Sequence, residues 1–360
     1  MFYFLTELRD VYSYLNIFRY ITFRSGMAAV TTFLLCMILG PLFIKASRRK
    51  KMQEKAKRDD APDLDKFQES KEGTPTMGGI FIIGSIVIST LLWANLTNIF
   101  VILTLFICIT LAILGGLDDY IKLTQKKRGL SAGVKFIWQI ILAGVVGSVI
   151  YLDPHVSTQL DIPFFKNILI SLGPLYVIWI ICVVVGASNA VNLTDGLDGL
   201  AIGCTLMVAI ALGLLSYVVG HAQFSGYLFI PYISGAGELT VICAAIVGAS
   251  LGFLWFNCYP ASVFMGDVGS LPLGGVLGTI AVCIKKELLL VFLGGVFVLE
   301  AVSVIMQVAS FKLTGKRIFK MSPFHHHLQL SGWRESKIIV RFWIIAIILA
   351  IITLSTLKIR

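Results

Sequence analysis

Charged side chains are scarce in this chain. Lys and Arg together number 30 and Asp and Glu 20, so only 14% of the 360 residues are charged, whereas 57% are hydrophobic. A soluble domain carries roughly 25% charged residues, and the composition therefore excludes an ordinary soluble protein of this length. The sequence predicts an all-α polytopic membrane protein in which residues 1–360 form a single integral membrane domain.

Closely spaced cysteine pairs are also missing. The seven Cys residues include no C-x-x-C pair and lie mostly within apolar runs, which disfavours a disulfide framework or a zinc site of that type. We interpret them as small apolar core residues. The net charge of +10 would suit nucleic acid in a soluble protein. In a membrane protein Lys and Arg first report topology, and we expect no nucleic-acid partner.

Long apolar runs predict about ten transmembrane helices. About 20 apolar residues cross the roughly 30 Å hydrocarbon layer. Such runs occur at about 26–46, 74–93, 98–118, 132–152, 168–188, 199–219, 238–257, 264–284, 288–308 and 339–358. Residues 1–25 lack the basic start and the cleavage site of a secretory signal. Their apolar residues recur at helical spacing, which predicts an interfacial N-terminal helix.

The distribution of basic residues predicts the orientation. An even number of spans places both termini on one side of the membrane. Most basic residues lie in the loops of the opposite side, which are residues 45–71, 122–128 and 309–338. The positive-inside rule makes these loops cytoplasmic and turns both termini outward. We find no internal repeat of the kind that many transporters contain.

The stretch from Asn189 to Gly199 stands out between two apolar runs. Asn192, Asp195 and Asp198 recur every third residue, so in a helix or turn they face one side. Gly196 and Gly199 leave the backbone open to a ligand. A polar loop between two helices would explain a single stretch of this kind, but carboxylates this close to hydrocarbon are costly without a polar or cationic partner.

Four further polar clusters fall on the same predicted side of the membrane. These clusters are Lys71-Glu72-Gly73-Thr74-Pro75-Thr76, Asp118-Asp119, Asn257 with Asp267, and His325-His326-His327 in the long 309–338 loop. Polar residues without a common role would be distributed over both faces of the membrane. The convergence instead predicts an active-site cleft at the cytoplasmic face.

Each cluster also has a structural explanation. Asp118 and Asp119 would suit a solvated helix end, although a helix C-terminus disfavours anions, and Asp267 between glycines would suit a helix cap. Glu300, inside a predicted span, indicates either a site or a packing role. Adjacent helical positions point about 100° apart, so we expect Asp118 and Asp119 to differ in role.

The chemistry of these groups suits a phosphorylated substrate. Mg²⁺ takes one or two carboxylates and shares phosphate oxygens with its substrate. Three consecutive histidines do not converge easily on one ion, so zinc is disfavoured, and beside Arg317 and Lys320 they suit an anion. Phosphoryl transfer needs positioning, charge neutralisation and a nucleophile. We therefore predict phosphoryl transfer at the membrane surface.

At these residues the chain resembles the polyprenyl-phosphate N-acetylhexosamine-1-phosphate transferases, and it is most similar to their phospho-N-acetylmuramoyl-pentapeptide transferase branch. The motifs that carry the resemblance are Gly73 to Gly79, Asp118-Asp119-Tyr120, Asn189 to Gly199, Asn257 to Gly269 and Met321 to His327. The acidic motifs resemble the whole superfamily, whereas the triple histidine resembles this branch. The resemblance covers nearly the whole chain.

The resemblance implies a reaction and its partners. Phospho-MurNAc-pentapeptide would pass from UDP-MurNAc-pentapeptide to undecaprenyl phosphate, with Mg²⁺, to give lipid I and UMP in peptidoglycan synthesis. It also implies a homodimer embedded in membrane lipid, in a bacterial cytoplasmic (inner) membrane.

The resemblance further implies site roles by motif. Asp267 would bind the metal, and Asp118 and Asp119 would handle the metal or the lipid phosphate. A uridine pocket would contain Lys71, Asp198, Asn257 and Phe264. The groups around the diphosphate and sugar would be Thr76, Asn192, Asp195, His325, His326 and His327.

Two alternatives remain open at this level. A sister enzyme that transfers GlcNAc-1-phosphate would share the aspartates, so they do not discriminate between the two. A transporter or lipid flippase would place acids through the bilayer midplane and on both faces, and of the groups named here only Glu300 fits that pattern.

Overall fold

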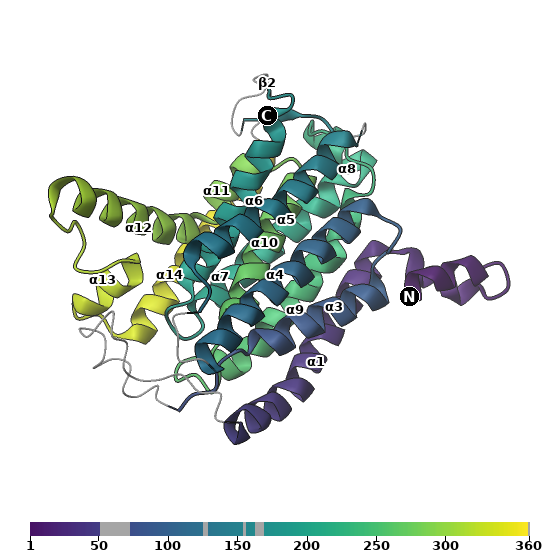
Figure 1. Ribbon diagram of the computed structural model, residues 1–360. Coiled ribbons are helices and arrows are strands. Elements are labelled where there is room, and N and C mark those ends of the chain that lie inside the picture. The colour runs from purple at the N-terminus through teal and green to yellow at the C-terminus, as the bar shows by residue number, and fades with distance from the viewer. Residues whose placement is uncertain (51–72, 125–128, 154–155, 163–168, 359–360) are drawn as a thin grey trace.

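Helices form the body of the protein. The structure is a computed structural model that describes residues 1–50, 73–124, 129–153, 156–162 and 169–358 (Figure 1). Within these residues eight helices are long and apolar enough to cross a membrane. They are α1 (Ile21–Arg49), α4 (Ile99–Thr124), α5 (Ala132–Leu152), α6 (Leu175–Thr194), α7 (Leu200–Val219), α9 (Leu239–Asn257), α12 (Gly295–Thr314) and α14 (Glu335–Ser355).

Two further apolar helices are shorter. α3 (Gly79–Trp93) has 15 residues and α10 (Asp267–Cys283) has 17. With the eight longer helices they fall on the ten predicted apolar runs, of which the run 288–308 also contains the short helix α11 (Glu287–Leu293). The prediction of an all-α polytopic membrane protein is confirmed, while the number of crossings stays a prediction.

The predicted span 288–308 is broken in the structure. α11 (Glu287–Leu293) ends at Gly294, whose backbone nitrogen donates to the Leu290 carbonyl at 2.7 Å, and α12 starts at Gly295. Two adjacent glycines weaken a helix at that point. The break lets α12 lean out of the bundle, with α13 (Phe324–Leu330) beneath its outer part in Figure 1.

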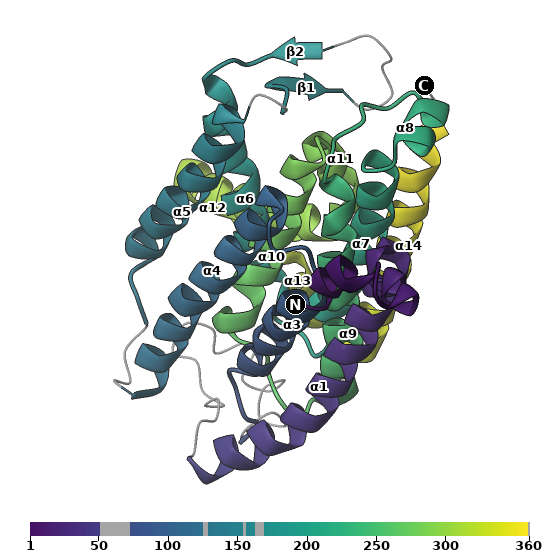
Figure 2. The ribbon, with the colours of Figure 1, turned by 90° about the vertical axis from the view of Figure 1, so that its right-hand side faces the viewer.

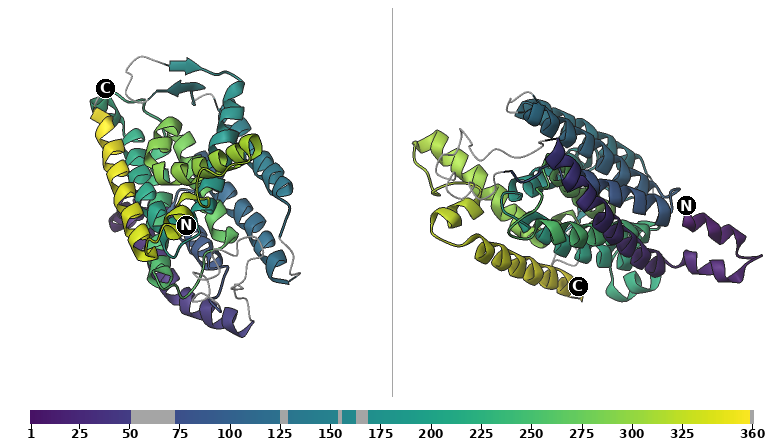
Figure 3. Two further views of the ribbon diagram at one scale, coloured as in Figure 1. Left: turned by 90° about the vertical axis from the view of Figure 1, so that its left-hand side faces the viewer. Right: turned by 90° about the horizontal axis from the view of Figure 1, so that it is seen from below.

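The first 20 residues form two short 3₁₀ helices, η1 (Phe2–Leu8) and η2 (Ser13–Arg19), rather than the single helix that we expected for residues 1–25. They project from the bundle on the side away from α12 (Figures 1 and 3). The rings of Phe2 and Phe18 lie 4.7 and 6.2 Å from the ring of Trp93 at the end of α3. These aromatic contacts with another helix, which sequence periodicity does not report, organise the segment.

The remaining elements lie mostly toward one end of the bundle. β1 (Gln159–Asp161) pairs antiparallel with β2 (Leu169–Ser171), and Figure 2 shows this small sheet at the end of the bundle opposite the last turn of α4. The shorter elements are α8 (Ala222–Leu228), η5 (Ala236–Glu238) and η6 (Thr356–Lys358). Five of the seven cysteines are buried and all are free, as expected for core residues.

Glycines allow α3, α4 and α10 to meet closely. A Cβ atom on Gly79 of α3 would lie 2.2 Å from the backbone nitrogen of Gly269, and one on Gly115 of α4 would lie 2.2 Å from the carbonyl oxygen of Asp267. Neither contact leaves room for a side chain, and backbone atoms do not yield easily. The start of α10 is therefore pressed between α3 and α4, which determines where Asp267 lies.

Candidate active site

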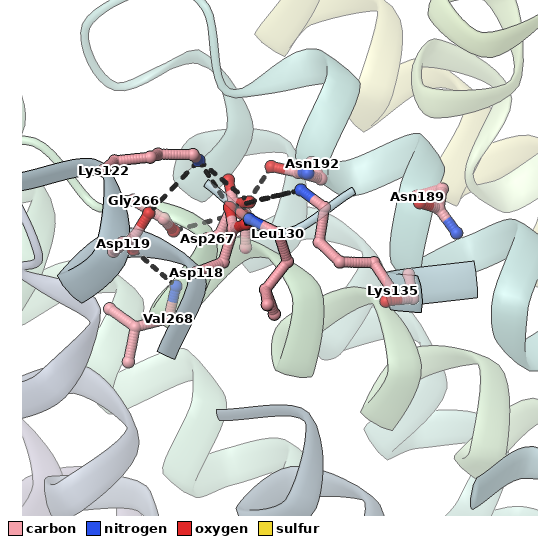
Figure 4. A network of polar contacts seen from close by, with 12 residues as sticks. Asp118, Asp119, Lys122, Leu130, Lys135, Asn189, Asn192, Gly266, Asp267 and Val268 are labelled. Atoms are coloured by element: carbon pink, nitrogen blue, oxygen red, sulfur yellow. Dashed lines mark hydrogen bonds and ion pairs between the residues drawn. The ribbon is translucent and has the colours of Figure 1, made fainter. Parts of the chain in front are cut away.

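Three carboxylates meet where α4 and α10 touch. Asp118 and Asp119 lie in the last two turns of α4, and Asp267 is the first residue of α10. Each side chain offers an oxygen, and these oxygens lie within 4.8 Å of one another. The Asp118 side chain is fully buried, and those of Asp119 and Asp267 are 7% and 13% exposed. Figure 4 shows the three acids side by side.

Two lysine ammonium groups lie among these carboxylates. Lys122 Nζ is 2.7 Å from Asp118 Oδ2, 3.4 Å from Asp119 Oδ1 and 3.1 Å from Asp267 Oδ2. Lys135, near the start of α5, places its Nζ 3.2 Å from Asp118 Oδ2 and 3.1 Å from Asp267 Oδ2. Carboxylates this close repel one another without cations, and here the two ammonium groups offset that repulsion (Figure 4).

Asp118 and Asp119 turn toward different neighbours, as their adjacent positions in a helix require. Asp118 Oδ1 accepts a hydrogen bond from the backbone nitrogen of Leu130 at 2.6 Å, just before α5. Asp119 Oδ2 accepts one from the backbone nitrogen of Val268 at 3.0 Å, in α10. Asp118 thus binds the backbone just before α5, and Asp119 holds the N-terminus of α10 against α4.

This donor set fits a divalent metal ion. Mg²⁺ prefers oxygen ligands, takes one or two protein carboxylates and completes its shell with water and phosphate oxygens. The cluster supplies three carboxylates, and the ammonium groups of Lys122 and Lys135 offset only part of their negative charge. Among the described residues it is the one group of acids, histidines and cysteines with the spacing of a metal site.

Asn192, from the middle acidic stretch, also reaches α10. Its Oδ1 accepts a hydrogen bond from the hydroxyl of Ser270 at 2.9 Å. One turn earlier in α6, Asn189 donates to Gln139 of α5 at 2.8 Å and to the Val185 carbonyl at 2.8 Å. The end of α6 is thus tied to both α5 and α10, and Asn192 lies beside the start of α10 (Figure 4).

Asp198 and Asn257 connect the turn after α6 with the loop before α10. Asp198 Oδ2 accepts from the backbone nitrogen of Ala261 at 3.0 Å. Asn257 accepts from the nitrogen of Gly199 at 2.9 Å and donates to the carbonyl of Val263 at 2.8 Å. Both side chains are buried. Their bonds to the backbone shape this region, and their assignment to a uridine pocket stays a prediction.

The segment before α3 runs beside the same loop. The nitrogen of Phe264 donates to the Pro75 carbonyl at 2.8 Å, and the nitrogen of Gly78 donates to the Phe264 carbonyl at 2.8 Å. Thr76 lies between these two bonds and is half-buried. The structure therefore brings Thr76 and Phe264 together, whereas Lys71 lies outside the described residues. Asp195, also half-buried, follows the last residue of α6.

The three histidines of α13 point to different surroundings. His325 is fully buried, its Nδ1 lies 3.1 Å from an oxygen of Glu300, and its ring lies against Gly196. His326 Nδ1 lies 2.8 Å from Gln329 Oε1 on the same helix. The side chain of His327 accepts from the Lys320 nitrogen at 3.2 Å. Of the three, His325 makes the contact with the acidic stretch 189–199.

Our sequence reasoning missed two of the cations at this site. Lys122 was used only to orient the chain, although its spacing of three and four residues from the acid pair places it on their face of the helix. Lys135 lies inside the predicted span 132–152, and an ionisable residue within such a span is itself a signal of a site. Gln139, which binds Asn189, carried no comparable signal.

Comparison with protein families matches two parts of the chain. The model of glycosyl transferase family 4 matches residues 100–285, which include all three acids of the cluster. A phospho-N-acetylmuramoyl-pentapeptide-transferase signature matches residues 71–83, the segment that leads into α3.

Full-length relatives are similar over the whole chain. A phospho-N-acetylmuramoyl-pentapeptide-transferase of Citrifermentans bemidjiense is 53% identical and aligns over 100% of both chains. One from Pelobacter propionicus is 54% identical over 96% of each chain, and one from a Geobacter species is 53% identical over 100% of both. Similarity of this extent covers every element that builds the acid cluster.

Proposed function

The chain belongs to the phospho-N-acetylmuramoyl-pentapeptide transferase family, and from that premise we propose how its residues carry out the transfer. The enzyme moves phospho-MurNAc-pentapeptide from UDP-MurNAc-pentapeptide to undecaprenyl phosphate and forms lipid I and UMP, the first membrane step of peptidoglycan synthesis. The observation that carries the proposal is the cluster of Asp118, Asp119 and Asp267, whose oxygens lie within 4.8 Å of one another.

The acid cluster is the place where charge is neutralised. Asp267, with Asp118 and Asp119, would hold Mg²⁺, which supplies positive charge to the phosphate oxygens and stabilises negative charge that develops during transfer. With a metal ion on the carboxylates, Lys122 and Lys135 would be free to pair with phosphate oxygens of the substrate. Their contacts with two of the acids, at 2.7 to 3.2 Å, place them within reach of both.

The residues around the cluster position the nucleotide sugar. Asp198, Asn257 and Phe264 belong to the region that we assign to the uridine, together with Lys71. The region that we assign to the diphosphate and the sugar contains Thr76, Asn192, Asp195, His325, His326 and His327. The hydrogen bonds of Asn192 to Ser270 and of Phe264 to Pro75 support this arrangement, because they hold the two groups of residues beside α10.

The reaction proceeds by direct attack. An oxygen of undecaprenyl phosphate forms a bond to the β-phosphorus, and the bond between that phosphorus and the bridging oxygen breaks, so that UMP leaves. A phosphate monoester has its second pKa near about 6 and is largely ionised at neutral pH. It therefore needs little help from a base, and the carboxylates act chiefly by holding charge and orientation.

The orientation in the membrane follows from the basic loops. Both termini face outward and the acid cluster faces the cytoplasm, where a soluble nucleotide sugar reaches it, while the lipid phosphate arrives from the bilayer. Lys122 and Lys135 at the same end as the cluster fit this orientation. We also propose a homodimer in the cytoplasmic (inner) membrane.

A transfer assay with purified protein tests the proposal. UDP-MurNAc-pentapeptide and undecaprenyl phosphate are supplied with Mg²⁺, and UMP release is followed with and without EDTA, with UDP-GlcNAc in a parallel reaction. We expect release with the muramoyl substrate alone, abolished by EDTA and restored by Mg²⁺. Release with UDP-GlcNAc instead would assign the chain to the sister reaction, and no release from folded protein would contradict the transfer.

A trapping experiment separates direct attack from a two-step route. In the two-step route a carboxylate attacks first and a covalent phospho-enzyme forms. Protein incubated with the nucleotide sugar alone, without undecaprenyl phosphate, should release no UMP and carry no added phosphoryl-sugar mass. An acyl phosphate on Asp118 or Asp119 under these conditions would contradict direct attack.

A further inference from the structure

A buried carboxylate–histidine pair connects α12 with the acidic stretch 189–199. Glu300 and His325 are both fully buried, and Oε2 of Glu300 lies 3.1 Å from Nδ1 of His325. The backbone nitrogen of His325 also donates to Oε2, at 3.4 Å. On the other side of the ring, a Cβ atom on Gly196 would lie 2.3 Å from Nε2. The imidazole thus fills the space between Glu300 and the turn that begins at Asp195.

This pair carries unused hydrogen-bonding capacity. Nδ1 of His325 faces Oε2 of Glu300 at 3.1 Å, but within the described part of the chain Nε2 of His325 and Oε1 of Glu300 have no hydrogen-bond partner. Buried polar groups are almost always hydrogen-bonded, and leaving one unpaired costs about 1–3 kcal/mol. Groups that stay unpaired in the free protein are suited to a partner that arrives with a ligand. Nε2 lies against the turn that carries Asp195 and Asp198, so that partner would bind at this turn.

The buried face of α12 is polar where it holds the histidine segment. The buried residues of this helix are Val296, Phe297, Glu300, Ser303 and Gln307. Gln307 accepts from the backbone nitrogens of Ile318 and Phe319 at 3.0 and 2.9 Å, and so fixes the segment that leads to α13. Glu300, two turns earlier, meets α13 itself. Glu300 and Gln307 on this face of α12 therefore determine where His325 lies.

We propose that Glu300 is a positioning residue, which acts on the transfer reaction through His325. Its carboxylate faces Nδ1 and holds the ring so that Nε2 points toward the turn 195–199 and the substrate diphosphate. A carboxylate behind a histidine fixes which nitrogen carries the proton and how the ring is oriented. The inference rests on the proposed function, because it assumes that His325 serves the transfer.

A purely structural role for Glu300 predicts a different outcome of mutation than a positioning role does. Replacing a whole buried ion pair by apolar residues of similar volume is often neutral or stabilising, whereas removing one partner leaves the other unpaired. If Glu300 only filled space in α12, Glu300→Leu would keep both stability and turnover. If Glu300 orients His325, Glu300→Leu keeps the fold and loses turnover, and Glu300→Gln, which retains an acceptor oxygen for Nδ1, loses less.

The test measures UMP release and the thermal unfolding midpoint of full-length protein in detergent. Loss of such a partner from a metal-bound histidine costs about 10- to 100-fold, and for Glu300→Leu we expect a fall of that order in the kcat of the folded protein, with a thermal midpoint that stays above the assay temperature. Glu300→Gln should fall between the two. Ser303→Ala is the matched control, because Ser303 is buried one turn further along α12, and it should leave kcat unchanged.

A double substitution distinguishes positioning from an independent effect. If Glu300 acts through the ring, Glu300→Leu added to His325→Ala should lower kcat by less than about twofold, since coupled residues are not additive. Full turnover by Glu300→Leu, additive losses in the double variant, or a fall in midpoint that accounts for the lost turnover would each overturn the proposal. Wild-type protein without turnover would overturn the proposed function as well, so the two failures are distinguishable.

Discussion

The ammonium nitrogen of Lys135 lies 3.1 Å from a carboxylate oxygen of Asp267, although the two residues are 132 positions apart in the sequence. The contact brings α5 to the start of α10. It also places a positive charge where the proposed reaction needs a metal ion, so we expect lysine and metal to compete for the same oxygen.

Removing this competing charge should change metal binding and turnover in opposite directions. Lys135→Met keeps the apolar stem and removes the ammonium group. We expect Mn²⁺ to bind about tenfold more tightly in the absence of substrate, a change of about 1.4 kcal/mol, while kcat falls because a phosphate partner is lost. Electron paramagnetic resonance titration with Mn²⁺ measures the first effect. Lys312→Met, at an exposed position in α12, is the control, and equal Mn²⁺ affinity in both variants would contradict the competition.

Asp267 should be indispensable for the metal response. Asp267→Asn keeps the shape of the side chain but removes its negative charge. That charge lies at the N-terminus of α10 and contacts the ammonium groups of both lysines. We expect kcat/KM to fall more than about 100-fold, the order found when a single group that stabilises developing charge is removed. The residual rate should no longer depend on Mg²⁺ concentration. Asp10→Asn, at an exposed position, is the control, and a normal Mg²⁺ dependence in Asp267→Asn would remove this residue from the site.

The close approach of α3 to α10 can be tested with a pair of glycines on one helix. In Gly79→Ala the new methyl group would lie 2.2 Å from the backbone nitrogen of Gly269, whereas at Gly84 no atom lies within 4 Å. Overpacking of this kind costs about 1–3 kcal/mol, so Gly79→Ala should lower the thermal midpoint and the transfer rate. Gly84→Ala should be neutral or slightly stabilising. Equal midpoints would show that α3 and α10 are further apart.

A buried ion pair at the other end of the bundle should matter for stability and not for chemistry. Two nitrogens of Arg24 bind the two oxygens of Glu238 at 2.7 and 2.6 Å. Arg24→Met leaves Glu238 buried without its cation, which costs about 3–5 kcal/mol. Arg24→Met combined with Glu238→Gln should recover much of this loss, because no unpaired charge remains. Unfolding in increasing concentrations of sodium dodecyl sulfate measures the stability of the single and the double variant. The kcat of the folded fraction of each variant should match that of the wild type.

The convergence of motifs was predictable from the sequence, because topology alone places alternate loops at one membrane face. The structure brings Pro75 to Phe264, Asp119 to Val268 and Asn192 to Ser270. These contacts join four of the five polar clusters, and the contact of His325 with Gly196 joins the fifth. The individual roles of these residues stay predictions.

Other features result from packing between distant segments and were not predictable from the sequence. The pair Glu300–His325 needs α12 to leave the bundle at Gly294 and α13 to fold back beneath it. The two 3₁₀ helices at the N-terminus depend on aromatic contacts with Trp93. Neither arrangement has a periodic signature, because each depends on a side chain from a distant part of the chain.

The sequence by itself determined the membrane class, the apolar runs, the side on which polar groups gather and the family. These properties depend on composition, hydrophobic length and charge bias, all of which act locally along the chain. Only the tertiary structure decided that Lys122 and Lys135 share the oxygens of the acid cluster and that Glu300 stands behind His325. Such pairings depend on how closely helices approach, and that distance is set by side chains, or by missing ones at glycine, on both helices at once.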